Sequence, residues 1–399
     1  MSDQPRTVNW TITGGEVIGS SGVERRDVHI VDGQFADAPG SAARRFDATG
    51  LTVAPGMVDL HGDGFERNLS PRSGVFFDPE TALIETDRQL IANGITTAYL
   101  AMTISWEPGL RSLDNARRLV AALDRVRSHL IADIRLQLRW EVFALDAVAE
   151  IEDWLTLTPR PTLAFNDHFS PLVADEGRLN PHLPVYAKRA GLTAEEYDEL
   201  TSRTKSRAAE VPGVVARLAR AAEKAGAVCF AHDETDAESR RRNRALGVAV
   251  SEFPLRRDAA AEAVAHDEPT ILGAPNVVRG GSHIGAMDAA PAIAEGLCSA
   301  LASDYYYPSM LAAAARLMAD VGAPAEVWSL VSGNAASAVG LGDRGTMQPG
   351  ASADLVLFAR DGGAARVEAV FRRGAPVLVR NPARSFQDAA PLIAEHSDQ

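Results

Sequence analysis

The chain has 399 residues, a length that favours one large domain or two domains and leaves ample room for a buried core. Its formal net charge of −13 argues against nonspecific nucleic-acid binding, because phosphate contacts need a basic face. No apolar run reaches the roughly 18 residues of a membrane helix, and residues 1–10 lack the pattern of a secretory signal. The two cysteines, Cys229 and Cys298, lie in apolar segments and are expected to be reduced. We therefore expect a cytoplasmic protein with no membrane or nucleic-acid partner; a homodimer is one option for its assembly.

Both ends of the chain are predicted to form short strands joined by turns. Residues 1–54 include "TVNWTITGGEVI" and "RRFDATGLTVAPG", and residues 343–399 include "ASADLVLFARDGG". In each segment apolar and polar residues alternate between Gly and Asp turn signals, which favours strands over helices. The two ends are predicted to combine into one small discontinuous β domain.

Residues 55–342 follow a different pattern, in which helices alternate with short apolar strands. The helical segment "PETALIETDRQLIANG" precedes "ITTAYLAM", and "EVPGVVARLARAAEKAG" precedes "AVCFAH". About eight such strands can be counted along this region. Strands that alternate with helices in this number are typical of a (β/α)8 TIM-type barrel, so the predicted fold class is α/β.

Polar residues stand where several of these strands end, and the active site of such a barrel lies at that face. The first strand ends at His61 and Asp63, which are two residues apart and therefore point to the same side. Taken singly, a histidine here is more often an ordinary hydrogen-bonding residue, and an aspartate is more often a helix cap. Taken together, the imidazoles and carboxylates suit zinc, iron or manganese, without any thiolate. We predict one or two divalent ions, zinc being the first choice, held by His61, Asp63, Glu141, His168, His232 and Asp304.

Two of these residues are also predicted to be catalytic. Glu141 lies in the chain between two histidine-bearing strands and is the candidate carboxylate to bridge two metal ions. Asp304, at the end of the last strand, is the candidate group to take the proton of an attacking water.

A second set of residues is predicted to bind a small anionic substrate. In "LGAPNVVRGGSHIG", Arg279, Ser282 and His283 offer donors, and the Gly280 and Gly281 amides can add more. The segment "ERNLSPRSG" adds further candidates close to the first predicted ligands. A plain glycine-rich connection and solvated surface side chains are the ordinary alternatives. The predicted substrate contacts are Glu66, Arg72, Arg279, Ser282 and His283.

Several segments resemble the amidohydrolase superfamily, and within it the diphosphatases of the carbon–phosphorus lyase pathway. They are "PGMVDLHGDGFERNLSPRSGV", "GITTAY", "RWE", "NDH", "HDET", "EFP", "GAPNVVRGGSH", "SDYYYPSML" and "GLGDRGTMQPGASADLV". The resemblance implies a metal-dependent hydrolase with a barrel and a two-part β domain. It also implies cleavage of α-D-ribose 1-methylphosphonate 5-triphosphate to the 5-phosphate and diphosphate. The six predicted ligands would then hold the metal, and Arg279 and His283 would contact the phosphates.

The chain departs from this pattern on the substrate side, at "FSPLVADEG", "GGSHIGA" and "LHGDGFERN". These departures leave open a related hydrolase that acts on a C–N bond, as a deaminase or cyclic amide hydrolase. A barrel that has lost catalysis and serves as a scaffold is a third interpretation, and the six retained candidate ligands argue against it.

Overall fold

The computed structural model describes residues 8–72, 74–173, 183–282 and 285–387. Its centre is a sheet of eight parallel strands, each hydrogen-bonded to the next in chain order. A parallel bridge between Gly62 and Asp304 joins the last strand back to the first and closes the barrel. The barrel strands are β8 (Met57–Gly62), β9 (Ile95–Ile104), β10 (Asp133–Glu141), β11 (Thr162–Asn166), β12 (Cys229–His232), β13 (Val250–Glu252), β14 (Thr270–Gly273) and β15 (Ala300–Ala302).

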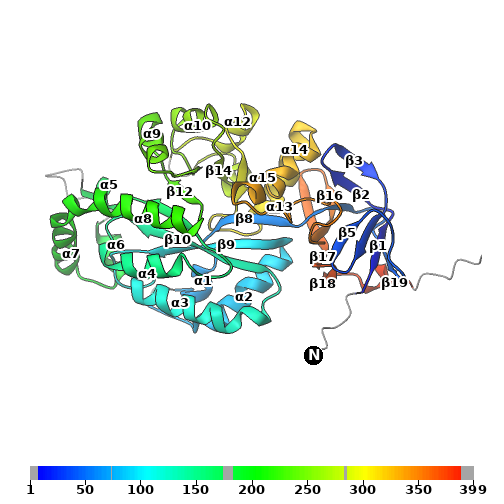
Figure 1. Ribbon diagram of the computed structural model, residues 1–399, viewed down its shortest axis with the longest axis horizontal. Helices are drawn as coiled ribbons and strands as arrows, with labels where there is room; N and C mark the ends of the chain where they lie inside the picture. Colours follow the sequence, from blue (N-terminus) through cyan, green and yellow to red (C-terminus); the bar gives the residue numbers. More distant parts are fainter. Residues whose placement is uncertain (1–7, 73, 174–182, 283–284, 388–399) are drawn as a thin grey trace, which may run out of the picture.

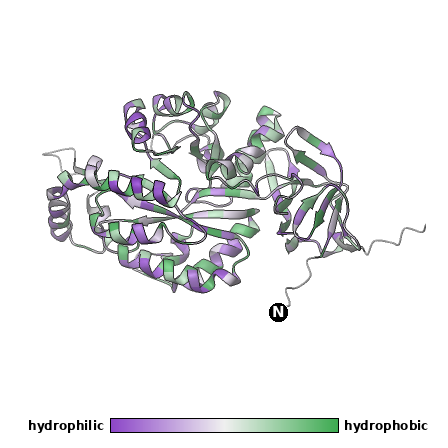
Figure 2. Cartoon of the chain, viewed as in Figure 1, coloured by the Kyte–Doolittle hydropathy of each residue, from purple (hydrophilic) through white to green (hydrophobic). Residues whose placement is uncertain are grey.

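The barrel strands are largely buried because helices cover their outer side. Every residue of β8 and of β9 is buried. Parallel strands that are buried on both faces have continuous apolar sequences rather than alternating ones. Figure 2 shows purple and green alternating along the helices that surround the strands.

Local signals in the sequence set the limits of the helices. The Asp78 side chain accepts the N–H groups of Glu80 and Thr81 at the start of α2, and Pro79 takes the first helical position. Gly226, at φ 67°, ends α8 in the left-handed conformation. The longer helices are α2 (Pro79–Ala92), α3 (Leu113–Val126), α6 (Leu183–Ala190), α7 (Ala194–Ser206), α8 (Val211–Ala225), α9 (Ala237–Ala245), α10 (Arg257–Val264) and α13 (Ser309–Val321). The shorter ones are α1 (Glu66–Leu69), α4 (Val148–Trp154), α5 (Phe169–Val173), α11 (Ala274–Arg279), α12 (Ala289–Ala294), α14 (Pro324–Ser329) and α15 (Gly333–Ala338), with the 3-10 turns η1 (Arg127–His129), η2 (Leu145–Ala147), η3 (Ala208–Glu210) and η4 (Pro382–Arg384).

Two further sheets are built from both ends of the chain. The six-stranded sheet has the order β18-β17-β16-β7-β2-β3, and the five-stranded sheet has the order β19-β6-β1-β4-β5. Figure 1 shows them together at one end of the barrel, with blue N-terminal strands beside orange and red C-terminal ones. Their strands are β1 (Trp10–Thr13), β2 (Glu16–Gly19), β3 (Gly22–Arg25), β4 (Val28–Val31), β5 (Gln34–Ala36), β6 (Arg44–Asp47), β7 (Thr52–Pro55), β16 (Leu355–Asp361), β17 (Ala364–Arg372), β18 (Ala375–Val379) and β19 (Ser385–Gln387).

Aromatic side chains from the two chain ends share the core of this unit. The ring of Phe371 meets Trp10 and Phe46 edge to face, at centroid distances of 5.6 and 5.5 Å. The predicted fold class is therefore confirmed: a TIM-type barrel with extra β sheets from both termini. The chain passes from β7 to β8 through Gly56 alone, while the residue limits chosen for the two domains stay a prediction.

The cysteines and the helices can be compared with the expectations from composition. Cys229 and Cys298 are buried free thiols. Among the helices that the structure describes, none has both the length and the apolar character needed to cross a bilayer.

Candidate metal centre and substrate cavities

Two buried histidines face each other across the carboxyl end of the barrel. His61 ends β8 and His232 ends β12, and their rings are stacked with centroids 5.2 Å apart. The fully buried Glu252, at the end of β13, lies between their Nδ1 atoms. Its oxygens are 2.8 Å from Nδ1 of His232 and 3.0 Å from Nδ1 of His61, the second contact lying outside hydrogen-bond alignment. Because a carboxylate on Nδ1 fixes ring orientation, Nε2 of each imidazole is left as the atom for a metal or another partner.

Electrostatics around Glu252 agree with this arrangement. Burial alone would raise the pKa of Glu252, but the two neighbouring imidazoles outweigh it and hold the pKa well below its usual range. Gln137 also donates its Nε2–H to Glu252 at 2.7 Å. The carboxylate is thus charged and fixed in place beneath the two rings.

His61 also belongs to a group with two aspartates. One ligand atom each from His61, Asp63 and Asp304 lies within 4.8 Å of the others. The backbone joins the three, because the Asp304 N–H donates to the His61 carbonyl and the Asp63 N–H donates to the Asp304 carbonyl. Nε2 of His61 is buried and has no hydrogen-bond partner, which is costly for a polar atom unless a further ligand binds it. One imidazole and two carboxylates therefore fit a divalent cation at this position.

A second group of possible ligands consists of His168, His232 and Asp233. Nε2 of His168 and Nε2 of His232 lie 3.5 and 3.6 Å from the Asp233 carboxylate. Burial alone would lower the pKa of His168, but Asp233 and Glu141 outweigh it and raise the pKa to about 9. Asp233 was not among the residues predicted from the sequence.

Glu141, the candidate bridging ligand, is occupied by other partners. It accepts hydrogen bonds from Nδ2 of Asn166 at 2.6 Å, from the backbone N–H of His168 at 3.1 Å and from Nδ1 of His168 at 2.8 Å. It belongs to none of the three His and carboxylate groups that the described residues form. The geometry therefore places Glu141 as the carboxylate that orients His168, and its role as a metal bridge stays a prediction.

A buried arginine stands between the two groups. Nη2 of Arg139, on β10, is 2.8 Å from Nε2 of His232, and Nη1 is 3.6 Å from the Asp63 carboxylate. Burial and the positive charge of Arg139 lower the pKa of His232, so that this imidazole is neutral. The segment "RWE" thus supplies a fixed cation to the site as well as a carboxylate.

Three non-glycine residues, each one or two positions after the end of a barrel strand, adopt left-handed backbone conformations. They are Asp233 (φ 58°), Phe253 (φ 53°) and Asp304 (φ 55°). Such conformations cost free energy and persist where the surrounding structure enforces them, often at functional sites. Burial and the neighbouring Asp63 raise the pKa of Asp304 to about 6, which suits a group that exchanges a proton near neutral pH.

A cavity of about 270 Å³ opens beside His232 and Asp304, and we name it the Arg279 cavity. Arg279 and Ser282 line it, as predicted for substrate contacts, while His283 lies outside the described residues. The expectation that the Gly280 and Gly281 amides bind an anion is wrong. Residues 274–279 form α11, and both glycine N–H groups donate to the Asn276 carbonyl at 3.1 Å, because they cap this helix.

The other two predicted substrate contacts have different surroundings. Both oxygens of Glu66 accept hydrogen bonds from Arg111, at 2.9 Å from Nε and 2.9 Å from Nη2. Arg72 is exposed and lines neither the Arg279 cavity nor a second cavity, described below, that lies beyond Glu141. The structure therefore brings Arg279 and Ser282 to the centre but not Arg72.

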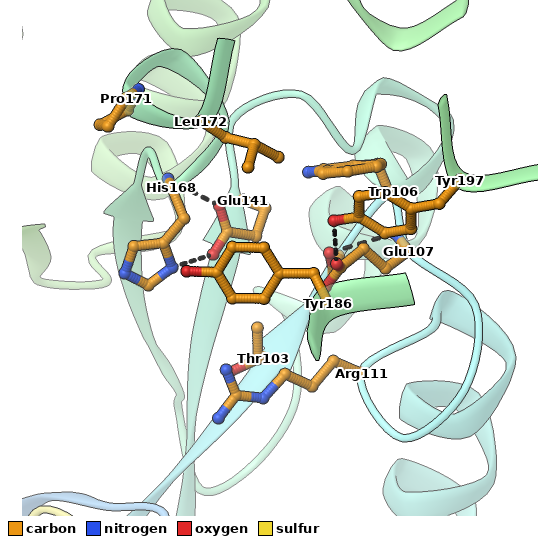
Figure 3. A pocket seen from close by; sticks show the side chains of 11 residues that line it. Thr103, Trp106, Glu107, Arg111, Glu141, His168, Pro171, Leu172, Tyr186 and Tyr197 are labelled. Atoms are coloured by element: carbon orange, nitrogen blue, oxygen red, sulfur yellow. Dashed lines mark hydrogen bonds and ion pairs between the residues drawn. The ribbon is translucent and has the colours of Figure 1, made fainter. Parts of the chain in front are cut away.

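A second cavity, of about 360 Å³, lies beyond Glu141 and His168 and is named the aromatic cavity. Figure 3 shows Tyr186 projecting across it, with Trp106 and Tyr197 behind. The buried Glu107 accepts a 2.6 Å hydrogen bond from the Tyr197 hydroxyl. Arg111 lines both cavities, and its charge is offset by Glu66. The full lining of the aromatic cavity is Thr103, Ser105, Trp106, Glu107, Arg111, Glu141, His168, Pro171, Leu172, Tyr186 and Tyr197.

A barrel with histidines and carboxylates at its strand ends is typical of the class of TIM-barrel hydrolases. Residues 52–378 match the amidohydrolase family, and the chain belongs to that family and is a hydrolase. It is 30% identical over 376 residues to α-D-ribose 1-methylphosphonate 5-triphosphate diphosphatase of Escherichia coli (strain K12), which covers 91% of this chain and 96% of the relative. The resemblance predicted from the sequence is thereby confirmed.

Other relatives are more distant. Dihydroorotase from Shouchella clausii (strain KSM-K16) is 29% identical over 160 residues, which is 39% of this chain and 34% of the relative. Two solved structures share the fold at 14% identity. Dihydropyrimidinase from Brevibacillus agri has a TM-score of 0.60 and covers 93% of this chain and 95% of its own. An adenosine deaminase from Xanthomonas campestris with bound zinc has a TM-score of 0.61, and the match covers 97% of this chain and 96% of the deaminase chain.

The sequence pattern missed several residues of this centre. Glu252 stands at the end of a barrel strand, in "VAVSEFP", so its strand-end position was a usable signal. Asp233 directly follows the predicted residue His232, and Arg139 precedes the predicted residue Glu141 by two positions. Arg111 follows β9 in a loop, and nothing in the local sequence distinguishes it.

The position of Glu252 leads to a prediction about metal affinity. Glu252→Gln removes the charge that orients His61 and His232, so we expect affinity for the divalent metal to fall about 10–100-fold. Competition with a chelator measures this change. Glu234→Gln is the matched control, because Glu234 is also a buried glutamate and its carboxylate pairs with Arg240, Asn243 and Ser251 and not with an imidazole. An equal loss of affinity in both variants would contradict the orienting role.

Proposed function

We propose that the protein is a metal-dependent hydrolase of a small anionic substrate and that it cleaves α-D-ribose 1-methylphosphonate 5-triphosphate with release of diphosphate. The observation that carries this proposal is the 30% identity to the Escherichia coli diphosphatase, which extends over more than nine-tenths of both chains. The Arg279 cavity supports it, because the guanidinium of Arg279 and three of the predicted metal ligands, Asp63, His232 and Asp304, line one space.

Chemical roles follow from the chain's own groups. A divalent metal held at this centre, with zinc as the first candidate and iron or manganese as alternatives, supplies Lewis acidity and a nucleophile from water at neutral pH. Asp304 accepts the proton of the attacking water, for which its raised pKa is suitable. Arg279 holds an anionic group of the substrate, and the buried Arg139 contributes positive charge beside the reacting group.

One observation favours a second candidate function. Of the arginines that line the Arg279 cavity, Arg111 and Arg139 already contact carboxylates, which leaves Arg279 to meet the substrate's charge. A triphosphate carries several negative charges, whereas a substrate with one anionic group needs a single guanidinium. A hydrolase of a C–N bond, such as a cyclic amide hydrolase or a deaminase, is therefore the alternative.

A substrate panel separates the two candidates. Metal-loaded protein is incubated with α-D-ribose 1-methylphosphonate 5-triphosphate, with a nucleoside triphosphate and with dihydroorotate as a cyclic amide. The proposal expects diphosphate from the first compound with the highest kcat/KM. Turnover of the cyclic amide without any diphosphate release would replace it with the alternative.

Arg279 provides a test of anion recognition. Arg279→Lys replaces a planar fork of donors by a single charged point, and Arg279→Ala removes the charge. A charge-assisted contact worth about 1.5–3 kcal/mol corresponds to an increase in KM of roughly 10–100-fold for the alanine variant. Arg72→Ala is the comparison, because this exposed arginine lines neither cavity, and its KM is expected to change much less. Unchanged kcat/KM in Arg279→Ala would show that this side chain does not bind the substrate.

A further inference from the structure

The described residues form three groups of possible metal ligands, and in one of them the Glu252 carboxylate already lies against the Nδ1 atoms of His61 and His232. The other two groups differ in whether the Nε2 atoms of their imidazoles are free. An imidazole nitrogen without hydrogen has one lone pair, which can serve either a metal ion or one hydrogen-bond donor. In the group of His61, Asp63 and Asp304, Nε2 of His61 has no partner. In the group of His168, His232 and Asp233, the lone pair of His232 is already in use.

The hydrogen bonds assign the protons on His232. Its Nδ1 lies 2.8 Å from the Glu252 carboxylate, so Nδ1 carries the hydrogen. Its Nε2 lies 2.8 Å from Nη2 of Arg139, and because a guanidinium can only donate, Nε2 must accept. The ring is therefore held between an acceptor on one side and a permanent cation on the other.

Arg139 is fixed in this position by its surroundings. Only 6% of the residue is exposed, it lies on strand β10, and Nη1 is 3.6 Å from the Asp63 carboxylate. A second divalent ion between His168, His232 and Asp233 would have to displace this guanidinium from His232 and stand beside its charge. Like charges at such short range in a buried site repel strongly.

We infer that Arg139 takes the place of a second metal ion, so that the centre binds one divalent cation, at His61, Asp63 and Asp304. The inference rests on the proposed metal-dependent function and narrows it. Of the six ligands predicted from the sequence, it retains three and makes His232 the partner of Arg139. Glu141 then orients His168 and does not bridge two ions.

Metal counting tests this directly. The wild-type protein is saturated with zinc or manganese, freed of excess ion by gel filtration and analysed for metal per chain. The wild type is expected to hold one ion per chain. Arg139→Met keeps an unbranched side-chain stem but removes the guanidinium and its charge, frees Nε2 of His232, and is expected to hold two.

Three further variants make the count specific. Adding His168→Ala to Arg139→Met is expected to return the count to one, because it removes a ligand of the second position. His168→Ala alone is expected to leave the wild-type count unchanged, and so is Arg111→Met, which removes another guanidinium of the site. These counts remain decisive if Arg139→Met does not fold, because the wild type and His168→Ala are counted independently of it.

Two ions per wild-type chain, or loss of the bound ion in His168→Ala, would overturn the inference. The counts are independent of turnover. One ion per chain without hydrolysis of any panel compound would remove the proposed function and leave the inference standing. Two ions per chain together with diphosphate release would overturn the inference and leave the proposed function standing.

Discussion

Replacement of His61 by alanine is expected to abolish both metal binding and hydrolysis. Nε2 of His61 is buried and has no hydrogen-bond partner among the described residues, and the ligand atoms of His61, Asp63 and Asp304 lie within 4.8 Å of one another. Without this nitrogen, two carboxylates would remain to hold the cation. We expect metal per chain to fall to the background of a metal-free preparation, and kcat/KM to fall with it.

Elemental analysis and a thermal melt should be done on the same preparation. His29→Ala is a suitable control, because His29 lies on β4 in the terminal sheets and its Nδ1 is 3.2 Å from the Thr11 hydroxyl. A His61→Ala protein that stays folded and retains its full metal content would exclude His61 as a ligand.

Asp304→Asn is expected to lower kcat by about 10²–10⁴-fold and to leave most of the metal bound. The asparagine keeps an oxygen that can face the cation but cannot accept the proton of an attacking water. The left-handed backbone at Asp304 is compatible with asparagine, so the local conformation should be preserved.

Single-turnover kinetics at saturating metal is the appropriate measurement for Asp304→Asn. The physical basis of the expectation is the position of the Asp304 carboxylate, which belongs to the group of ligand atoms within 4.8 Å of one another with His61 and Asp63. Wild-type turnover in the variant would assign proton transfer to another group.

The fold could be predicted from the sequence because its signals are local. Most barrel strands are short and largely apolar, and polar residues at or just after the ends of several of them mark the face where the strands converge. The helix over residues 79–92 carries its own cap in Asp78 and Pro79. The β sheets from both ends were predictable because alternation and turn residues recur at each end.

The predicted site was less complete, because its remaining members are defined by contacts between distant segments. The strand-end position of Glu252 was a usable signal, but its contacts with the rings of His61 and His232 exist only where β13 lies in the folded barrel. Gly280 and Gly281 resemble an anion-binding loop, yet their amides complete a helix end. The pairing of Glu66 with Arg111 joins residues 45 positions apart, and no spacing rule indicates it.

The aromatic cavity was not predicted for the same reason. Trp106 follows β9, whereas Tyr186 and Tyr197 come from α6 and α7, which lie between β11 and β12. Only the folded barrel brings this insertion over the end of β10 beside Glu141.

The most direct test of the metal centre is an anomalous diffraction experiment on crystals of the zinc- or manganese-loaded protein, recorded on both sides of the metal's absorption edge. We expect one strong peak at bonding distance, roughly 2.0–2.2 Å, from Nε2 of His61 and from oxygens of Asp63 and Asp304. A metal-loaded crystal whose peak lies away from these three residues, or that shows no peak at the barrel end, would contradict it.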